Sequence, residues 1–435
     1  MHIKNQIKFV LKFLINLIHY LIIRIGFSNA YIGYLRSNIS LKYRRSLYIN
    51  FKVIAKKNID YLAQQNVFKR YKIINQEEFT NNENLLGIFQ TNSITTLASV
   101  ENFVQESKIH FLPVNLNVCK FDKAIVTFKS DIIRVDDSCY WYKFHHHLMY
   151  KTIPADSDLV AIKEESLFLD KEKLDIKRLD KVISLIGARD HSWSHFLIQY
   201  LPKLEILKNY QDTSNVTILI SEKLDSNCKE LINFMKPQNC KIYELKEGFS
   251  IECSELYYVD NTSWLTDKSE SFVLGDTMVY EESLRIIKNL AIDYKLKNEQ
   301  SGKQQRKIYL KRDDTHRSII NSIEVDEILK KYGFEVIYGH EYSVKEKLKI
   351  FSEAQIVIGP ISSGFVNTIF CETGTSIIAF INKNRIWDSY LSTLADYFNL
   401  NLTYIPSSYM RNINDPHTSY SIDIDGLKKK IESIL

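Results

Sequence analysis

Hydrophobic and polar positions alternate along the second half of the chain in a way that is typical of a layered α/β protein. Short apolar runs recur after residue 180, and stretches with helical periodicity, such as 193–208 and 222–235, separate several of them. The runs that we predict as buried strands are 182–186, 216–220, 241–245, 256–259, 308–310, 334–338, 355–359 and 376–381. Strands that alternate with helices at this spacing form a parallel sheet with helices on both faces.

Two further signals divide this half of the chain. A polar stretch rich in Gln and Lys at 297–307 is the best linker candidate, so we predict one α/β unit on each side of it. In the second unit, Asn321 with Glu324 and Ser343 with Glu346 have the spacing of helix N-terminal capping boxes. Two such units that face a cleft make a two-Rossmann architecture.

The region before residue 180 has a different pattern. Between residues 60 and 175, short apolar runs are mixed with polar turns and show no regular strand–helix alternation, which indicates a small β-rich region. We therefore expect four parts: a tethering segment at 1–58, a mixed β-rich region at 59–178, a first Rossmann-like unit at 179–300 and a second at 301–435.

Charge is distributed unevenly along the chain. Residues 1–57 contain eleven of the 57 Lys and Arg residues and no Asp or Glu, which leaves 46 basic against 52 acidic residues in the remainder. The body of the protein is therefore slightly acidic, which argues against nucleic-acid binding. The six cysteines contain no C-x-x-C pair, and this favours a reducing compartment over a disulfide scaffold or a zinc ribbon.

The apolar stretch from residue 9 to residue 25 reads as an amphipathic helix. At about 100° per residue, five polar residues from position 4 to position 19 fall in one sector of about 120°; these are Lys4, Lys8, Lys12, Asn16 and His19. We expect this helix to lie on an anionic membrane surface, at the cytoplasmic face of the inner membrane. A signal peptide ending at Ala30, a transmembrane helix and an ordinary packing helix are the alternatives.

Candidate chemistry lies beyond the carboxyl ends of three predicted strands, where open α/β sheets bind ligands. One segment is the small-residue loop 359–364, followed by Asn367 on a helix, and another carries Arg312 and Arg317. Backbone N–H groups at a helix start and Arg side chains both bind phosphate oxygens, so these two segments favour a diphosphate-bearing ligand. A plain tight turn is the alternative for the loop.

The third strand end carries Asp190, His191 and His195. Histidines four residues apart share one face of a helix, but H-E-x-x-H and a third ligand are missing, so we expect no metal site. We expect His195 to contact a substrate in the cleft, with Asp190 or His191 near enough to accept a proton. A structural histidine at a helix start is the alternative.

At these segments the chain resembles glycosyltransferase family 61, over roughly residues 180 to 382. The stretch from His195 through Pro202 to Leu204 resembles the first motif of the family. The second resembles Tyr309, Arg312, Arg317, Asn321, Gly333 and Phe334. The third resembles Gly359, Pro360, Ser363, Gly364, Asn367, Phe370, Gly374 and Thr375. The chain departs from the family pattern at Gln199, at Ile361 and Ser362, and at Ala379.

The resemblance implies a GT-B-like enzyme that transfers a sugar from a nucleotide-sugar donor to a glycan or lipid-linked glycan with inversion, in surface or capsular polysaccharide biosynthesis. Asp190 or His191 is then the base, and no metal or other cofactor is expected. The donor would contact Arg312, Arg317, Gly359, Ser362, Ser363, Gly364 and Asn367. The alternatives are a non-catalytic component of a polysaccharide assembly complex that retains the fold, and an unrelated α/β hydrolase.

The tether hypothesis predicts that removing residues 1–25 releases the protein from membranes without unfolding the body, since these residues belong to no predicted sheet. Flotation with anionic vesicles measures this, with the full-length chain as the control. A truncated protein that still floats completely with the vesicles would show that the tether lies elsewhere.

Overall fold

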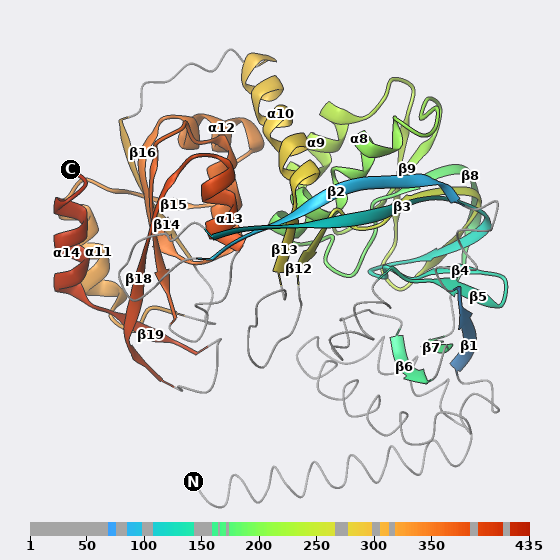
Figure 1. The fold of residues 1–435 in the computed structure, drawn as a ribbon, viewed down its shortest axis with the longest axis horizontal. Helices are drawn as coiled ribbons and strands as arrows, with labels where there is room; N and C mark the ends of the chain where they lie inside the picture. The colour runs from blue at the N-terminus through green and yellow to red at the C-terminus, as the bar shows by residue number, and fades with distance from the viewer. Residues whose placement is uncertain are drawn as a thin grey trace, which may run out of the picture.

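The computed structural model describes residues 68–74, 85–97, 108–142, 159–163, 166–170, 174–265, 277–297, 305–312, 318–382, 390–411 and 418–435. The predicted tethering helix lies outside them. The described chain is a mixed α/β protein built on two sheets, one of 13 strands and one of six (Figure 1). Among the described helices, none is long and apolar enough to cross a membrane.

The larger sheet contains every strand of the first two-thirds of the described chain. Its order is β10-β9-β8-β11-β3-β4-β5-β1-β7-β6, with β2, β12 and β13 attached at the side through β3 and β2. The strands are β1 (Phe68–Ile73), β2 (Leu85–Leu97), β3 (Lys108–Thr127), β4 (Ile133–Val135), β5 (Ser138–Tyr140), β6 (Leu159–Lys163), β7 (Ser166–Asp170), β8 (Leu174–Ser184), β9 (Thr217–Ser221), β10 (Lys241–Leu245), β11 (Ser250–Val259), β12 (Ser263–Leu265) and β13 (Thr277–Tyr280).

One end of this sheet is a run of four parallel strands, and β1 and β5 form a further parallel pair in the β-rich part. Strands β10, β9, β8 and β11 run parallel to one another, as the pattern after residue 180 predicts. On its other side β11 pairs antiparallel with β3, so the same sheet continues from residues 250–259 into the β-rich region before residue 178. The described residues of that region are almost all in strands, in agreement with its irregular apolar pattern.

The helix predicted at 193–208 is interrupted. It consists of α7 (Trp193–His195), a π-helical turn η1 (Phe196–Tyr200) and α8 (Lys203–Leu207). Pro202 has no backbone N–H with which to bond the Ile198 carbonyl. That carbonyl instead accepts the hydroxyls of Thr262 and Ser283, at 2.5 and 2.8 Å. The proline thus ties this helix to two segments far away in the sequence.

The smaller sheet has the order β15-β14-β16-β17-β18-β19, with all neighbours parallel except the last pair. Its strands are β14 (Arg306–Lys311), β15 (Glu335–Tyr338), β16 (Ala354–Pro360), β17 (Ser376–Ile381), β18 (Asn401–Met410) and β19 (Tyr420–Ile422). In chain order the first five are arranged 2-1-3-4-5, so the direction of winding reverses between β14 and β16. All four strands predicted after residue 300 are present.

Helices cover both faces of this smaller sheet (Figure 1). They are α11 (Ser322–Lys331), α12 (Val344–Ser352), the 3₁₀ helix η2 (Ser363–Phe370), α13 (Tyr390–Tyr397) and α14 (Ile424–Glu432). The capping box at Ser343 and Glu346 is confirmed. The one predicted at Asn321 is wrong. The Asn321 side-chain oxygen Oδ1 accepts instead from the Ile422 backbone N–H at 3.0 Å, a partner that sequence spacing does not reveal.

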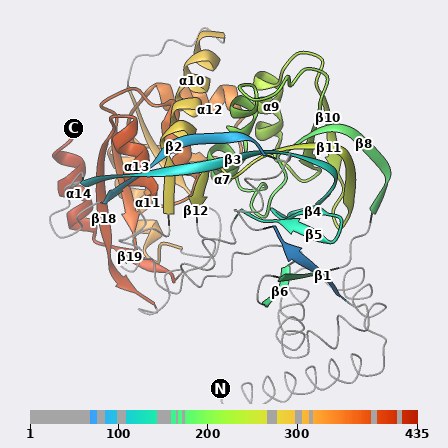
Figure 2. The same ribbon diagram turned by 45° about the vertical axis from the view of Figure 1, so that its right-hand side comes forward.

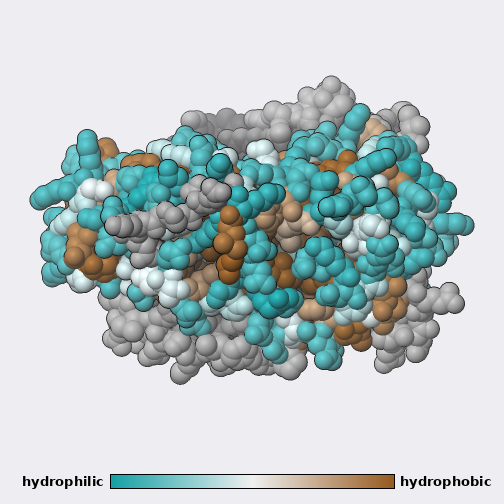
Figure 3. Space-filling view, turned by 90° about the horizontal axis from the view of Figure 1, so that it is seen from above, coloured by the Kyte–Doolittle hydropathy of each residue, from teal (hydrophilic) through white to brown (hydrophobic). Residues whose placement is uncertain are grey.

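The two sheets share one hydrophobic core. It is continuous from Leu207 and Ile287 on the first side to Phe365 and Leu394 on the second. Between the sheets lie α9 (Ser226–Met235) and α10 (Glu281–Lys297), and β2 reaches across to pack on α10 and α13 (Figures 1 and 2). Seen from above, the described surface is mostly hydrophilic, with apolar side chains in small scattered groups (Figure 3).

A buried charge lies under α8. Lys203 is 0% exposed, and its ammonium lies 4.4 Å from the centre of the Tyr258 ring. Burial raises the pKa of the nearby Asp260 to about 6, while the Lys203 charge lowers it. Asp260 also accepts hydrogen bonds from the Asn117 backbone at 2.9 Å and from the Tyr140 hydroxyl at 2.6 Å. Lys203, the lysine of the Leu-Pro-Lys-Leu sequence, therefore has a structural role: its positive charge offsets the buried Asp260 carboxylate.

Replacing Lys203 by Met leaves the Asp260 carboxylate without this countercharge. We expect the lost charge compensation to lower the free energy of unfolding by on the order of 1–3 kcal/mol near pH 7.5. The loss should shrink toward pH 5, where Asp260 is protonated and needs no partner. Urea unfolding at several pH values measures this, and Lys203→Met/Asp260→Asn should recover most of the loss. A loss independent of pH would show that Lys203 acts by packing alone.

Candidate active site

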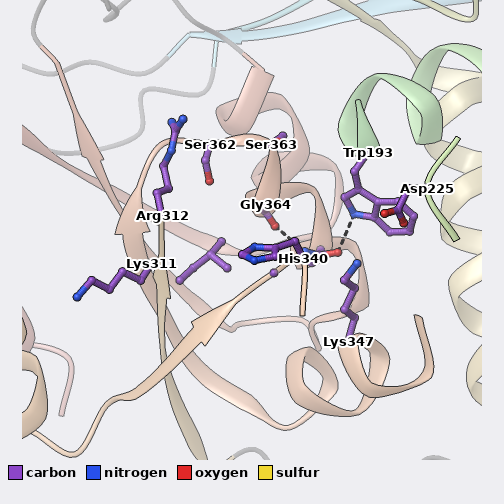
Figure 4. A pocket seen from close by; sticks show the side chains of 12 residues that line it. Trp193, Asp225, Lys311, Arg312, His340, Lys347, Ser362, Ser363 and Gly364 are labelled. Atoms are coloured by element: carbon purple, nitrogen blue, oxygen red, sulfur yellow. Dashed lines mark hydrogen bonds between the residues drawn. The ribbon is translucent and has the colours of Figure 1, made fainter. Parts of the chain in front are cut away.

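A cavity of about 310 Å³ opens at the carboxyl ends of β14 and β16, where the winding of the smaller sheet reverses. This reversal point is the usual ligand position in an open parallel sheet. Figure 4 shows the lining side chains. They are Trp193, Asp225, Leu310, Lys311, Arg312, Gly339, His340, Lys347, Ser362, Ser363, Gly364 and Asn367.

The cavity brings together five of the residues predicted to contact a donor: Arg312, Ser362, Ser363, Gly364 and Asn367. Gly359 is buried in β16 and does not line it. A Cβ at Gly359 would lie 2.3 Å from the Leu310 carbonyl oxygen, so glycine here permits the close approach of β16 to β14. Arg317 lies outside the described residues.

Arg312 and Lys311, although adjacent, point in different directions (Figure 4). The Arg312 guanidinium reaches across to β16 and donates to the Ile361 carbonyl at 3.4 Å. The Lys311 ammonium turns away and pairs with Asp326 of α11. Arg312 is thus the cation that follows β14 into the cavity, next to the start of η2.

Sequence reasoning missed the roles of several lining residues. Gly339 and His340 follow β15 directly, and Asp225 precedes α9 shortly after β9. The rule that selected Arg312, a position just beyond a strand's carboxyl end, would have found them. Lys347 lies one turn inside α12 and belongs to no sequence motif, so its role could not be predicted from the sequence.

Trp193 links the two sheets at this cavity. Its indole N–H donates to the Asn367 side-chain oxygen at 2.9 Å, and the Lys347 ammonium lies 4.4 Å from its ring centre. A second bond between the sheets joins the Asn227 amide to the Tyr342 carbonyl at 3.1 Å. The larger sheet thus contributes one wall of a cavity whose floor belongs to the smaller sheet.

Asp190 is 1% exposed and lies in the turn between β8 and α7. Burial raises the pKa of its carboxyl to about 7, against the effect of a backbone hydrogen bond from Gly187 at 3.4 Å. Gly187 allows this packing, because a Cβ there would lie 2.2 Å from the Tyr200 ring and 2.3 Å from the Asp131 carboxylate. Asp190 is therefore too deep to receive a proton directly from a bound substrate.

His191 is more accessible, with its side chain 39% exposed. Its Nδ1 lies 3.9 Å from an Asp190 carboxylate oxygen. A carboxylate near one ring nitrogen stabilises the imidazole ring once it is protonated. Burial raises the pKa of the Cys228 thiol; the Lys347 ammonium lowers it and the Asp190 carboxylate raises it, so Cys228 lies between this turn and the cavity wall.

His195 is held in one tautomer by Gln199. The Ser263 carbonyl can only accept, so the Gln199 atom 2.8 Å from it is the amide nitrogen. The Gln199 oxygen then faces His195 Nδ1 at 2.7 Å, which makes Nδ1 the donor and places the lone pair of the neutral ring on Nε2. The departure at Gln199 thus supplies a neutral partner that fixes the tautomer of His195.

The other departures from the family pattern lie at the second sheet. Ile361 is half-buried, with its backbone N–H bonded to the Phe380 carbonyl at 3.0 Å. Ala379 is 0% exposed within β17, between β16 and β18. In the part of the chain that the structure describes, no group of three or more His, Cys, Asp or Glu side chains could hold a metal ion. Asp313 and Asp314, two carboxylates that directly follow Arg312 in the chain, lie outside the described residues.

Comparison with known proteins identifies one family. Residues 193–378 match the family model Glycosyltransferase 61, which confirms the resemblance found in the motifs and indicates a glycosyltransferase. The match begins at Trp193 and ends in β17, so it contains every residue that lines the cavity. No curated protein matches the chain.

The raised pKa of Asp190 predicts a specific pH dependence of stability. Between about pH 4 and 7 the folded chain keeps a proton that the unfolded chain has released, so the native protein loses stability as pH rises through this window. Asp190→Asn removes this term and keeps an oxygen for the Gly187 N–H. As the pH is raised from 4.5 to 7.5, the free energy of unfolding of the variant should rise by on the order of 3 kcal/mol relative to that of the native chain. Urea unfolding of both proteins across this pH range measures the difference. If the two proteins showed the same dependence of the free energy of unfolding on pH, the Asp190 carboxyl would not have the raised pKa that its burial predicts.

Proposed function

We propose that this glycosyltransferase, whose residues 193–378 form a Glycosyltransferase 61 domain, is an inverting enzyme that takes a sugar from a nucleotide-sugar donor bound in the cavity between β14 and β16. The observation that carries the proposal is the meeting of Arg312 with the start of η2 at the reversal point of a parallel sheet. A guanidinium and a helix N-terminus both favour a diphosphate there.

The donor side provides the charge stabilisation that the reaction needs. As the bond between the anomeric carbon and the diphosphate breaks, negative charge grows on the departing phosphate oxygen. Arg312 and the N–H groups at the start of η2 stabilise this charge, and the small residues Ser363 and Gly364 allow phosphate oxygens to approach the backbone. Arg317 and Gly359 complete the proposed donor site, the first by charge and the second by strand packing.

The acceptor side provides the base. We assign this role to His191, since it combines exposure with a carboxylate behind its Nδ1. His191 takes the proton of an acceptor hydroxyl, the hydroxyl oxygen attacks the anomeric carbon, and the nucleoside diphosphate leaves from the opposite face. Asp190 positions His191 and balances the charge of the protonated ring. His195, with its lone pair on Nε2, binds a second acceptor hydroxyl.

The wider context of the reaction is also part of the proposal. The two sheets correspond to a GT-B arrangement, with the donor on the smaller sheet and the acceptor on the parallel end of the larger one. The acceptor is a glycan or lipid-linked glycan of a surface or capsular polysaccharide. The basic segment 1–58 holds the enzyme on the cytoplasmic face of the inner membrane, close to lipid-linked acceptors.

A single set of titrations and transfer assays tests the two halves of the site. Arg312→Ala should weaken the binding of a nucleoside diphosphate by about 10- to 100-fold, the usual worth of a hydrogen bond to a charged group. His191→Gln should leave this affinity near normal and lower turnover by roughly 100-fold or more. Calorimetry with UDP, GDP, CDP and ADP measures the first effect, and transfer of labelled sugar to membrane lipids measures the second.

Lys307→Ala is the matched control for Arg312→Ala, because Lys307 is a cation on the same strand that bonds the Tyr332 carbonyl at 3.2 Å near the amino end of β14. Unchanged affinity in Arg312→Ala would remove the donor assignment. Nucleotide binding without any transfer in the native chain would instead support the non-catalytic alternative.

A further inference from the structure

The cavity has two chemically different ends (Figure 4). Arg312 and Ser362 lie at one end, next to the start of η2. Trp193, Asp225 and Lys347 lie at the other end, which faces the larger sheet, and Trp193 follows His191 by two residues in the chain. If the first end holds the diphosphate, the second end is where the transferred sugar lies, because the anomeric carbon must face the acceptor base.

Lys347 is unusual for a lysine in a cavity wall. Its side chain is only 4% exposed, and among the described residues its ammonium has no carboxylate within ion-pair distance and no hydrogen-bond acceptor. Its recorded contact is the face of the Trp193 ring at 4.4 Å. The Lys347 Nζ keeps accessible surface, so its N–H donors are open to the cavity that this residue lines. Lys347 therefore points to a ligand that supplies acceptor oxygens.

The charge around Lys347 indicates which oxygens these are. Burial lowers the pKa of Lys347, whereas the negative charges of Asp225 and Glu230 raise it. Asp225 lines the same end of the cavity and uses one carboxylate oxygen as the N-cap of α9, bonding the Asn227 N–H at 2.9 Å. The nearby carboxylates offset the lysine charge, so an additional anion would gain little here. Neutral hydroxyl groups satisfy both side chains.

We propose that Trp193, Asp225 and Lys347 form the sugar-binding end of the donor site and select a neutral sugar through a pair of neighbouring hydroxyls. Lys347 donates to one hydroxyl oxygen, Asp225 accepts from the next hydroxyl, and the Trp193 ring forms an apolar wall. This inference rests on the proposed function. It excludes donors whose sugar carries a carboxylate, since that group would meet Asp225.

The test compares nucleotides with and without a sugar. The native chain should bind UDP-glucose, UDP-N-acetylglucosamine or GDP-mannose at least about 10-fold more tightly than UDP or GDP alone. Lys347→Met keeps the packing of the stem and should abolish this gain, while affinity for UDP and GDP stays within about twofold. UDP-glucuronate should bind the native chain more weakly than UDP-glucose, and Asp225→Asn, which retains a good N-cap, should narrow that difference.

Lys349→Met, an exposed position on the same helix, is the matched control and should change nothing. An equal loss for UDP and UDP-glucose in Lys347→Met would mean that Lys347 binds phosphate, and would overturn the inference. A native preference for glucuronate, or no gain from any neutral sugar, would overturn it as well. These results differ from failure of the proposed function, in which UDP and GDP do not bind or Arg312→Ala has no effect.

Discussion

The hydrogen bond between the Trp193 indole and the Asn367 amide is the contact on which the cavity depends. It joins a helix of the larger sheet to a helix of the smaller one at the point where the smaller sheet reverses its winding. Each partner is constrained in turn: Asn367 also donates to the Gly364 carbonyl at 2.9 Å, and the Trp193 ring covers the Lys347 ammonium. The loop at the start of η2, the tryptophan wall and the buried lysine therefore form one unit.

Behind this unit lies a layer of buried polar groups that fixes the acceptor turn. The Asp131 carboxylate accepts from the Ala188 backbone and from the Tyr200 hydroxyl, both at 3.3 Å, and Tyr200 accepts from the Arg189 backbone at 3.2 Å. The turn is thus held from below by a strand connection of the β-rich region, and burial without full pairing keeps the Asp190 carboxyl easy to protonate. Precise placement of catalytic groups needs this kind of rigid support.

The same architecture explains why the departures from the family pattern are compatible with activity. Gln199 departs from the family pattern yet still orients His195, because an amide fixed by the Ser263 carbonyl presents its oxygen to the ring. Ala379 is buried inside the smaller sheet, away from the cavity.

The sequence by itself determined the local features: the strands of the smaller sheet, the capping box at Ser343, and the identity of Arg312, Ser362, Ser363, Gly364 and Asn367 as a group beyond strand ends. These follow from periodicity and from residues close together in the chain. Only the tertiary structure decided that the β-rich region and the first α/β unit share one sheet, since pairing of β3 with β11 joins segments about 130 residues apart. It also decided that Trp193, Asp225 and Lys347 meet, and that Asp190 is buried behind His191. Burial and long-range contact depend on how distant segments pack, and no local pattern encodes them.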